Sequence, residues 1–161
     1  MFDDYLVNKT SLKNVYDDDG NAVGFKFGVR LSNYRGIFLS LVNDFYVNMD
    51  GKTYDTGDFA LEVNHKAPRT MEALKSCTFE QWNMQDEAIL YVRQEGGLSE
   101  GTHHLEYLPI TMDGYGYQAH DERWVTNPPK PGEGGGKQLR AVRFELVLND
   151  NSAPVSKKSI W

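Results

Sequence analysis

The sequence predicts an all-β protein: one antiparallel β-sandwich or jelly-roll-like domain with one long loop. Three observations support this fold class. About eight short segments alternate between apolar and polar residues, or are continuously apolar, and turn-forming residues separate them. No segment carries helical periodicity for longer than about one turn. A stretch without regular pattern, residues 112–138, lies between the last two predicted strands and is longer than compact domains usually contain.

The chain of 161 residues is long enough for one domain with its own hydrophobic core. We expect residues 1–150 to form the sandwich, with the loop 112–138 inserted between its last strands. Residues 151–161 are expected to form a C-terminal tail.

The N-terminal segments predict two hairpins. Leu6–Val15 and Val23–Leu31 flank a strong turn signal at Asp17–Asn21, and the second segment alternates as a half-buried strand does. Ile37–Val42 is continuously apolar and predicts a strand. The alternating residues after it run up to Asp50-Gly51, a dipeptide typical of tight hairpin turns.

The rest of the chain predicts one short helix and several strands. Thr70–Lys75 is expected to form a single helical turn with Thr70 as its N-cap. The predicted strands are Phe59–Val63, Phe79–Trp82, Ala88–Arg93, Thr102–Ile110 and Leu139–Leu148.

Composition excludes several classes of function. The formal charge of −6 and the pI near 5.2 argue against nucleic acid or an anionic membrane as a partner. Cys77 is the single cysteine, so an intrachain disulfide is excluded and a reducing compartment is expected. The N-terminus is acidic without an apolar run, and Ile37–Val42 is far shorter than the ~20 residues that span a bilayer. We therefore expect a soluble, cytoplasmic protein.

No self-contained catalytic or metal site is predicted. Gly132–Gly136 lacks the Gly-Lys-Ser sequence and the following helix of a phosphate-binding loop, and Cys77 is typical of a small buried hydrophobic residue. His103 and His104, with His120 and Asp121, are residue types that bind zinc or manganese. Adjacent histidines on a strand point to opposite faces, which disfavours a shared metal. A stand-alone metal-dependent enzyme using His103, His120 and Asp121 stays open as an alternative.

The first half of the long loop is the strongest candidate for a contact surface. It is rich in aromatic and charged side chains, which stack on sugar or polyphenol rings and also dominate protein interfaces. The sequence does not decide between these two uses. The candidate contact residues in the loop are Tyr115, Tyr117, His120, Arg123 and Trp124.

Three local motifs resemble a known family. They are the opening Asp3-Asp4-Tyr5-Leu6-Val7, the stretch Asn33–Ser40, in which Tyr34-Arg35-Gly36 leads into an apolar strand, and the glycine turn Gly96–His103. In their order and spacing they resemble the small (β) subunit of bacterial C-glycoside deglycosidases. The likeness covers most of the chain up to about Ile110 and includes the final strand.

The resemblance implies a specific function. Enzymes of this kind, found in gut and soil bacteria, cleave the carbon–carbon bond between a 3-oxo sugar and a flavonoid or isoflavonoid aglycone. The family's large subunit is a TIM barrel that holds a divalent metal, typically manganese, and the catalytic base. The small subunit is a β-sandwich that docks on it, and we expect it to bind no metal and to be inactive alone.

Tyr34 and Arg35 match the family motif and join the loop residues as candidates for contact with the substrate or the partner. The substrate is then expected at or near the interface between the subunits. The alternative is a carbohydrate-binding sandwich without a catalytic role, in which Tyr115, Tyr117 and Trp124 form a stacking platform.

Overall fold

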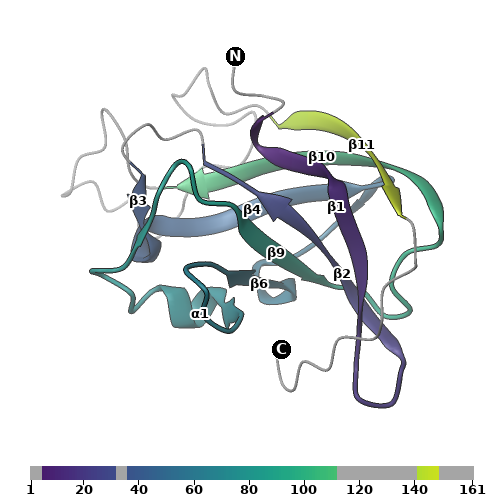
Figure 1. The fold of residues 1–161 in the computed structure, drawn as a ribbon, viewed down its shortest axis with the longest axis horizontal. Helices are drawn as coiled ribbons and strands as arrows, with labels where there is room; N and C mark the ends of the chain where they lie inside the picture. The colour runs from purple at the N-terminus through teal and green to yellow at the C-terminus, as the bar shows by residue number, and fades with distance from the viewer. Residues whose placement is uncertain (1–4, 32–35, 112–140, 149–161) are drawn as a thin grey trace.

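The computed structural model describes residues 5–31, 36–111 and 141–148, which form antiparallel sheets and confirm the predicted all-β class (Figure 1). A five-stranded sheet has the order β1 (Val7–Tyr16), β2 (Ala22–Val29), β9 (Ala88–Arg93), β6 (Phe59–Glu62), β7 (Arg69–Thr70). A four-stranded sheet has the order β11 (Val142–Leu148), β10 (Gly101–Thr111), β4 (Val42–Met49), β5 (Lys52–Thr53). A small ribbon pairs β3 (Ile37–Phe38) with β8 (Gln81–Trp82).

The core lies between the two larger sheets. Phe25 and Phe27 of β2 point inward, as the alternation of that strand predicts, and both are fully buried. The Phe27 ring meets the Tyr107 ring of β10 edge-on, with centroids 5.9 Å apart. Phe45 of β4 stacks on Tyr107 at 6.1 Å. The Phe27–Tyr107 contact joins the two sheets directly, whereas Phe45 and Tyr107 lie on neighbouring strands of the same sheet.

Two predicted local features are confirmed. Asp50 and Gly51 have φ angles of 55° and 92°, the pair of positive values that a tight hairpin turn requires, and they connect β4 to β5. The helix α1 (Met71–Leu74) is a single turn, and the side chain of its N-cap, Thr70, accepts a hydrogen bond from the backbone N–H of Ala73 at 3.2 Å.

Two strand predictions are wrong in extent. Ile37–Val42 is not one strand: β3 ends at Phe38, a 3₁₀ turn η2 follows at Leu39–Leu41, and β4 begins at Val42. The turn carries the chain from the ribbon to the four-stranded sheet, and a continuously apolar run does not distinguish such a turn from a buried strand. The strand predicted from Phe79 is likewise limited to β8, because the backbone pairs with β3 only at Gln81 and Trp82.

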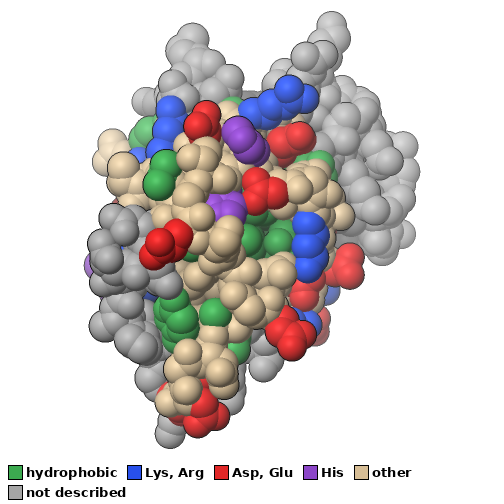
Figure 2. Space-filling model, turned by 90° about the vertical axis from the view of Figure 1, so that its right-hand side faces the viewer, with side chains coloured by type: hydrophobic (Ala, Val, Ile, Leu, Met, Phe, Trp, Pro, Cys, Tyr) green, Lys and Arg blue, Asp and Glu red, His purple; other side chains and the backbone are tan. Residues whose placement is uncertain are grey.

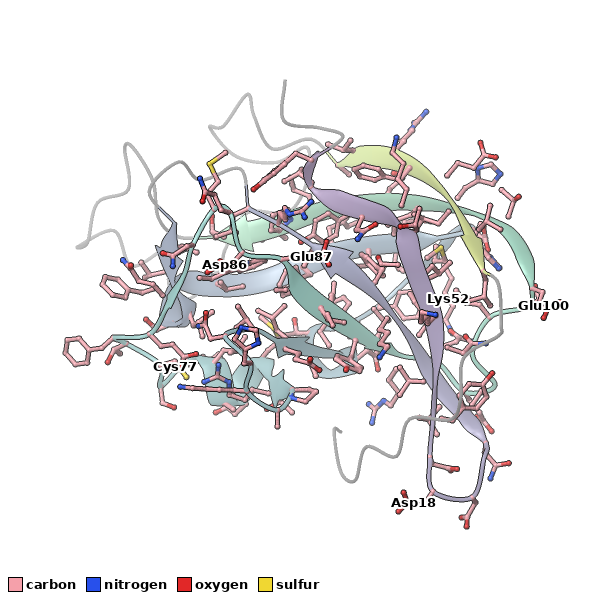
Figure 3. The ribbon with its side chains drawn as sticks, in the orientation of Figure 1. Asp18, Lys52, Cys77, Asp86, Glu87 and Glu100 are labelled. Atoms are coloured by element: carbon pink, nitrogen blue, oxygen red, sulfur yellow. The ribbon has the colours of Figure 1, made fainter. Side chains whose placement is uncertain are left out.

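The figures identify two ends of the molecule. Figure 2 views the end that lies on the right in Figure 1, where acidic, basic and histidine side chains are interspersed and hydrophobic atoms form small separate areas. Figure 3 labels Glu100 at this end and Cys77 at the opposite end. β10 runs towards the Cys77 end, where its last residue, Thr111, pairs with Val42 directly after η2. None of the helices described is long and apolar enough to cross a membrane.

Candidate functional site

The contact residues proposed from the sequence lie outside the described residues. They are Tyr34, Arg35, Tyr115, Tyr117, His120, Arg123 and Trp124, and Asp121 of the alternative metal set lies outside as well. The structure does place the residues that flank them. Leu31 and Gly36 flank the short stretch, and Thr111 ends the strand that leads into the long one.

The glycine turn before β10 is held in place by hydrogen bonds to a buried asparagine side chain. Asn14 of β1 is buried; its side-chain oxygen accepts a hydrogen bond from the Leu98 N–H, and its amide nitrogen donates one to the Leu98 carbonyl, both at 2.9 Å. Gly97 has a φ of 63°, and a Cβ atom there would lie 2.7 Å from the Asn14 oxygen. The motif that points to the family at this position is therefore explained by packing.

The paired histidines point to opposite faces, as the alternation of a strand predicts: His103 is buried and His104 is exposed. His103 Nδ1 lies 2.5 Å from an Asp50 carboxylate oxygen, and its Nε2 lies 2.7 Å from the Ser99 carbonyl. An ionised carboxylate and a backbone carbonyl can only accept, so this arrangement suits an imidazolium that donates from both nitrogens.

The electrostatics of this pair agree with that assignment. Burial works against the charged imidazolium, but the hydrogen bonds to Asp50 and Ser99 outweigh it and raise the pKa of His103 above 6.5. Burial likewise opposes the Asp50 carboxylate, yet the hydrogen bonds from His103 and from the His104 backbone lower its pKa. The pair ties the β4–β5 turn to β10, so its role is structural.

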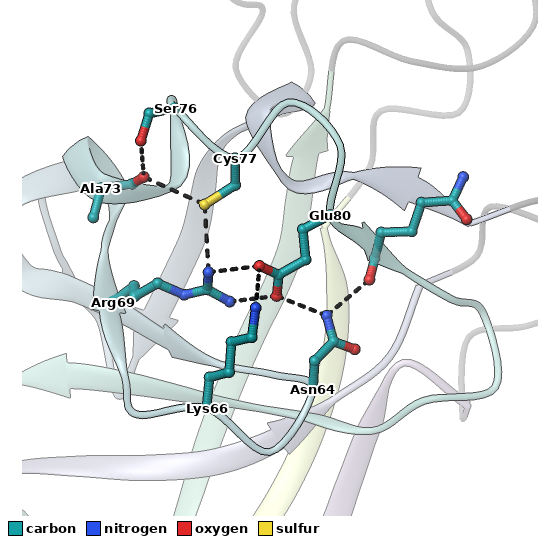
Figure 4. A network of polar contacts seen from close by, with 8 residues as sticks. Asn64, Lys66, Arg69, Ala73, Ser76, Cys77 and Glu80 are labelled. Carbon is teal, nitrogen blue, oxygen red and sulfur yellow. Dashed lines mark hydrogen bonds and ion pairs between the residues drawn. The ribbon is translucent and has the colours of Figure 1, made fainter.

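A second polar cluster lies at the Cys77 end (Figure 4). Arg69 of β7 binds the Glu80 carboxylate through two parallel hydrogen bonds of 2.8 and 2.7 Å. Lys66 and Asn64 each donate to the same carboxylate at 2.9 Å. The hydrogen bonds from Arg69, then from Asn64 and Lys66, hold the pKa of Glu80 well below its ordinary value.

Cys77 belongs to the same cluster. Its Sγ accepts a hydrogen bond from Arg69 Nη1 at 3.4 Å and donates one to the Ala73 carbonyl at 3.6 Å. The side chain is partly buried and packs against the hydrophobic core. The sequence shows only Lys75 as a cation near this cysteine, whereas the fold adds the guanidinium from a strand eight residues earlier.

The remaining described surface offers open grooves. One groove of about 820 Å³ lies on the outer face of the four-stranded sheet; it is lined by the side chains of Asn48, His104, Glu106, Arg143 and Glu145 among others. Within residues 5–31, 36–111 and 141–148, no group of three His, Cys, Asp or Glu side chains is placed to hold a metal ion.

Fold and polar clusters together define a β-sandwich protein in which the clustered ionisable groups of the described residues bond to one another and to the backbone. Comparison with known proteins gives the family. The family described as "C-glycoside deglycosidase beta subunit" matches residues 2–115. The chain belongs to this family.

A named relative agrees with the family match. The C-glycoside deglycosidase beta subunit of Eubacterium cellulosolvens (strain ATCC 43171 / JCM 9499 / 6) is 28% identical to this chain over 118 residues. The alignment covers 68% of this chain and 80% of the relative. The family match includes every described strand except β11, so it rests on both sheets.

Proposed function

We propose that this chain is the small, non-catalytic subunit of a hetero-oligomeric, cytoplasmic C-glycoside deglycosidase. The observation that carries the proposal is the family match over residues 2–115, the part of the chain that builds most of both sheets. The relative from Eubacterium is named as a beta subunit, which supports a second polypeptide as the partner. We propose a TIM barrel as that large subunit.

The proposed reaction is a base-initiated elimination. The substrate is a C-glycoside whose sugar has already been oxidised to its 3-oxo form, and the ketone acidifies the neighbouring C–H bond. A base of the large subunit removes that proton, the carbon–carbon bond to the aromatic aglycone breaks, and the aglycone carbon takes up a proton. The large subunit would also hold a divalent cation, expected to be manganese, which supplies electrostatic stabilisation for the charge that develops on oxygen.

The role of this chain in the proposal is to support the site. Its described ionisable clusters, Arg69–Glu80 and Asp50–His103, hold loops and turns of the sandwich in fixed positions. A rigid sandwich of this kind can position loops of a neighbouring subunit and exclude water from a shared site. Tyr34, Arg35 and the residues of the long loop stay the predicted contacts with substrate or partner.

Co-expression with a candidate TIM-barrel partner tests the proposal. We expect the two chains to elute together in size-exclusion chromatography and to cleave a 3-oxo-C-glucoside, while each chain alone is inactive. Full activity of this chain alone would refute its role as an auxiliary subunit. Separate elution, together with sugar-dependent changes in tryptophan fluorescence, would support the carbohydrate-binding alternative.

A further inference from the structure

Two phenylalanines on the segments around the β3–β8 ribbon are exposed to solvent. Phe79 is 92% exposed and Phe38 is 37% exposed. Phe38 pairs with Gln81 across the β3–β8 ribbon, and the Leu39 N–H donates to the Glu80 carbonyl one step further along. Phe79 directly precedes Glu80, so the two phenylalanines are carried by the two segments that meet at this ribbon. We call these two residues the phenylalanine patch.

The backbone that carries the patch is held on both sides of Phe79. The Ser40 N–H donates to the Cys77 carbonyl at 3.2 Å, and the Leu39 N–H donates to the Glu80 carbonyl at 2.9 Å. Immediately after Phe79, the Glu80 side chain is fixed by the hydrogen bonds of Arg69, Lys66 and Asn64 (Figure 4). Phe79 is therefore presented to solvent by a fixed loop.

Such a presentation is characteristic of an interface anchor. Single exposed apolar side chains are common on protein surfaces and do not by themselves indicate an interface. An aromatic side chain on a preorganised backbone is different, because binding then requires little further ordering. Val147, which is 58% exposed on the edge strand β11, is the other large hydrophobic residue found exposed in the described ranges and has no such neighbour.

The surroundings of the patch indicate what would cover it. The single negative charge of Glu80 is bonded to two positive charges, those of Arg69 and Lys66, within a chain whose formal charge is −6. The patch also adjoins the strand ends that lead to the predicted contact residues: Gly36 lies two residues before Phe38, and Thr111 pairs with the residue that follows η2. An apolar surface with acidic groups at its rim would complement this end.

We propose that the phenylalanine patch is the anchor by which this chain docks on the large subunit, with Phe79 entering an apolar pocket that has acidic groups at its rim. The inference rests on the proposed function, since the large subunit is the partner. It assigns the docking face to the end of the sandwich formed by β3, η2 and β8, and not to the groove over β4, β10 and β11.

The test compares Phe79→Ser with the matched control Val147→Ser, each measured for affinity to the immobilised TIM-barrel subunit. We expect Phe79→Ser to weaken binding by about 30-fold or more, as loss of an anchor residue does, and Val147→Ser to change it by less than about 2-fold. Phe79→Met, which keeps an apolar side chain, should restore most of the affinity. Because Phe79 is almost fully exposed, Phe79→Ser and Phe79→Met should unfold at the wild-type temperature.

The outcomes separate this inference from the proposed function. If the wild-type chain binds and Phe79→Ser binds equally well, the patch is not the docking site. The proposed role as an auxiliary subunit would still stand. Equal losses in Phe79→Ser and Val147→Ser would also overturn it, because the effect would not be specific to the patch. Failure of the wild-type chain to bind would overturn the proposed function, and this inference with it.

Discussion

Replacing Glu80 with glutamine removes the negative charge from a carboxylate that accepts hydrogen bonds from Arg69, Lys66 and Asn64. The substitution keeps the size of the side chain. It also turns one of the two oxygens into an NH₂ group, which then faces the donors of the guanidinium. The Arg69 side chain, 20% exposed, loses the group that balances its charge.

The expected cost follows from these contacts. Hydrogen bonds to charged groups contribute about 1.5–3 kcal/mol each, and the exposed Lys66 adds little. Because the carboxylate is itself only 20% exposed, solvent screens the Arg69 pair incompletely. We expect Glu80→Gln to lower the free energy of unfolding by about 2–3 kcal/mol, which for a domain of this size lowers Tm by about 5–10 °C.

The loss should also depend on pH. The pKa of Glu80 in the folded protein lies below its ordinary value of 4.5, so the stabilisation is present above that value and is lost as pH falls towards the folded pKa. The difference between the wild type and Glu80→Gln should therefore be larger at pH 7 than at pH 3.

Urea unfolding followed by the fluorescence of buried Trp82 measures these differences. Glu72→Gln is the matched control, because Glu72 is 86% exposed and pairs with the exposed Lys75 at 3.5 Å. It should change the free energy of unfolding by less than about 0.5 kcal/mol. If Glu80→Gln cost no more than this control, or lost the same free energy at both pH values, the reasoning about the cluster would be refuted.

Three further substitutions test other parts of the fold. Asp50→Asn should destabilise the protein more at pH 6 than at pH 9 in chemical denaturation. Because the pKa of His103 is raised in the folded protein, the stabilisation from the Asp50–His103 pair is complete below pH 6.5 and is lost as pH rises through the folded pKa. Equal losses at both pH values would contradict a charged His103. Tyr107→Phe should leave Tm unchanged or raise it by a few degrees, since the buried Oη has no hydrogen-bond partner in the described part of the chain; a large loss would show a missed partner. Gly97→Ala should lower the free energy of unfolding in urea more than Gly96→Ala does, because both glycines have positive φ but only a Cβ at Gly97 meets other atoms within 4 Å. Equal losses would mean that backbone strain alone, without the contact to Asn14, explains the cost.

Much of the fold follows from local patterns in the sequence. Alternation identified β2 and its inward face, and the turn at Asp50-Gly51 identified the β4–β5 hairpin. These predictions hold because period-two alternation and positive-φ turns are set by neighbouring residues. Leu39–Leu41 was misread because a continuous apolar run has no period by which a turn could be distinguished from a strand.

The contacts at the Cys77 end were not predictable in this way. Arg69 and Glu80 are eleven residues apart, and nothing in their spacing marks them as partners until β7 and the β8 ribbon bring them together. Phe79 was predicted to begin a strand, and its exposure depends on where that strand actually starts. Tyr34, Arg35 and the loop residues lie outside the described residues, so their predicted contacts stay predictions.

The fixed loop around Phe79 has a kinetic consequence. Because its backbone is already bonded on both sides, no segment of this loop needs to order before the proposed complex forms. Association through this end is then a rigid-body encounter, for which rate constants of about 10⁵–10⁷ M⁻¹s⁻¹ are typical. Substitutions at Phe79 should therefore leave the association rate almost unchanged and shorten the lifetime of the complex.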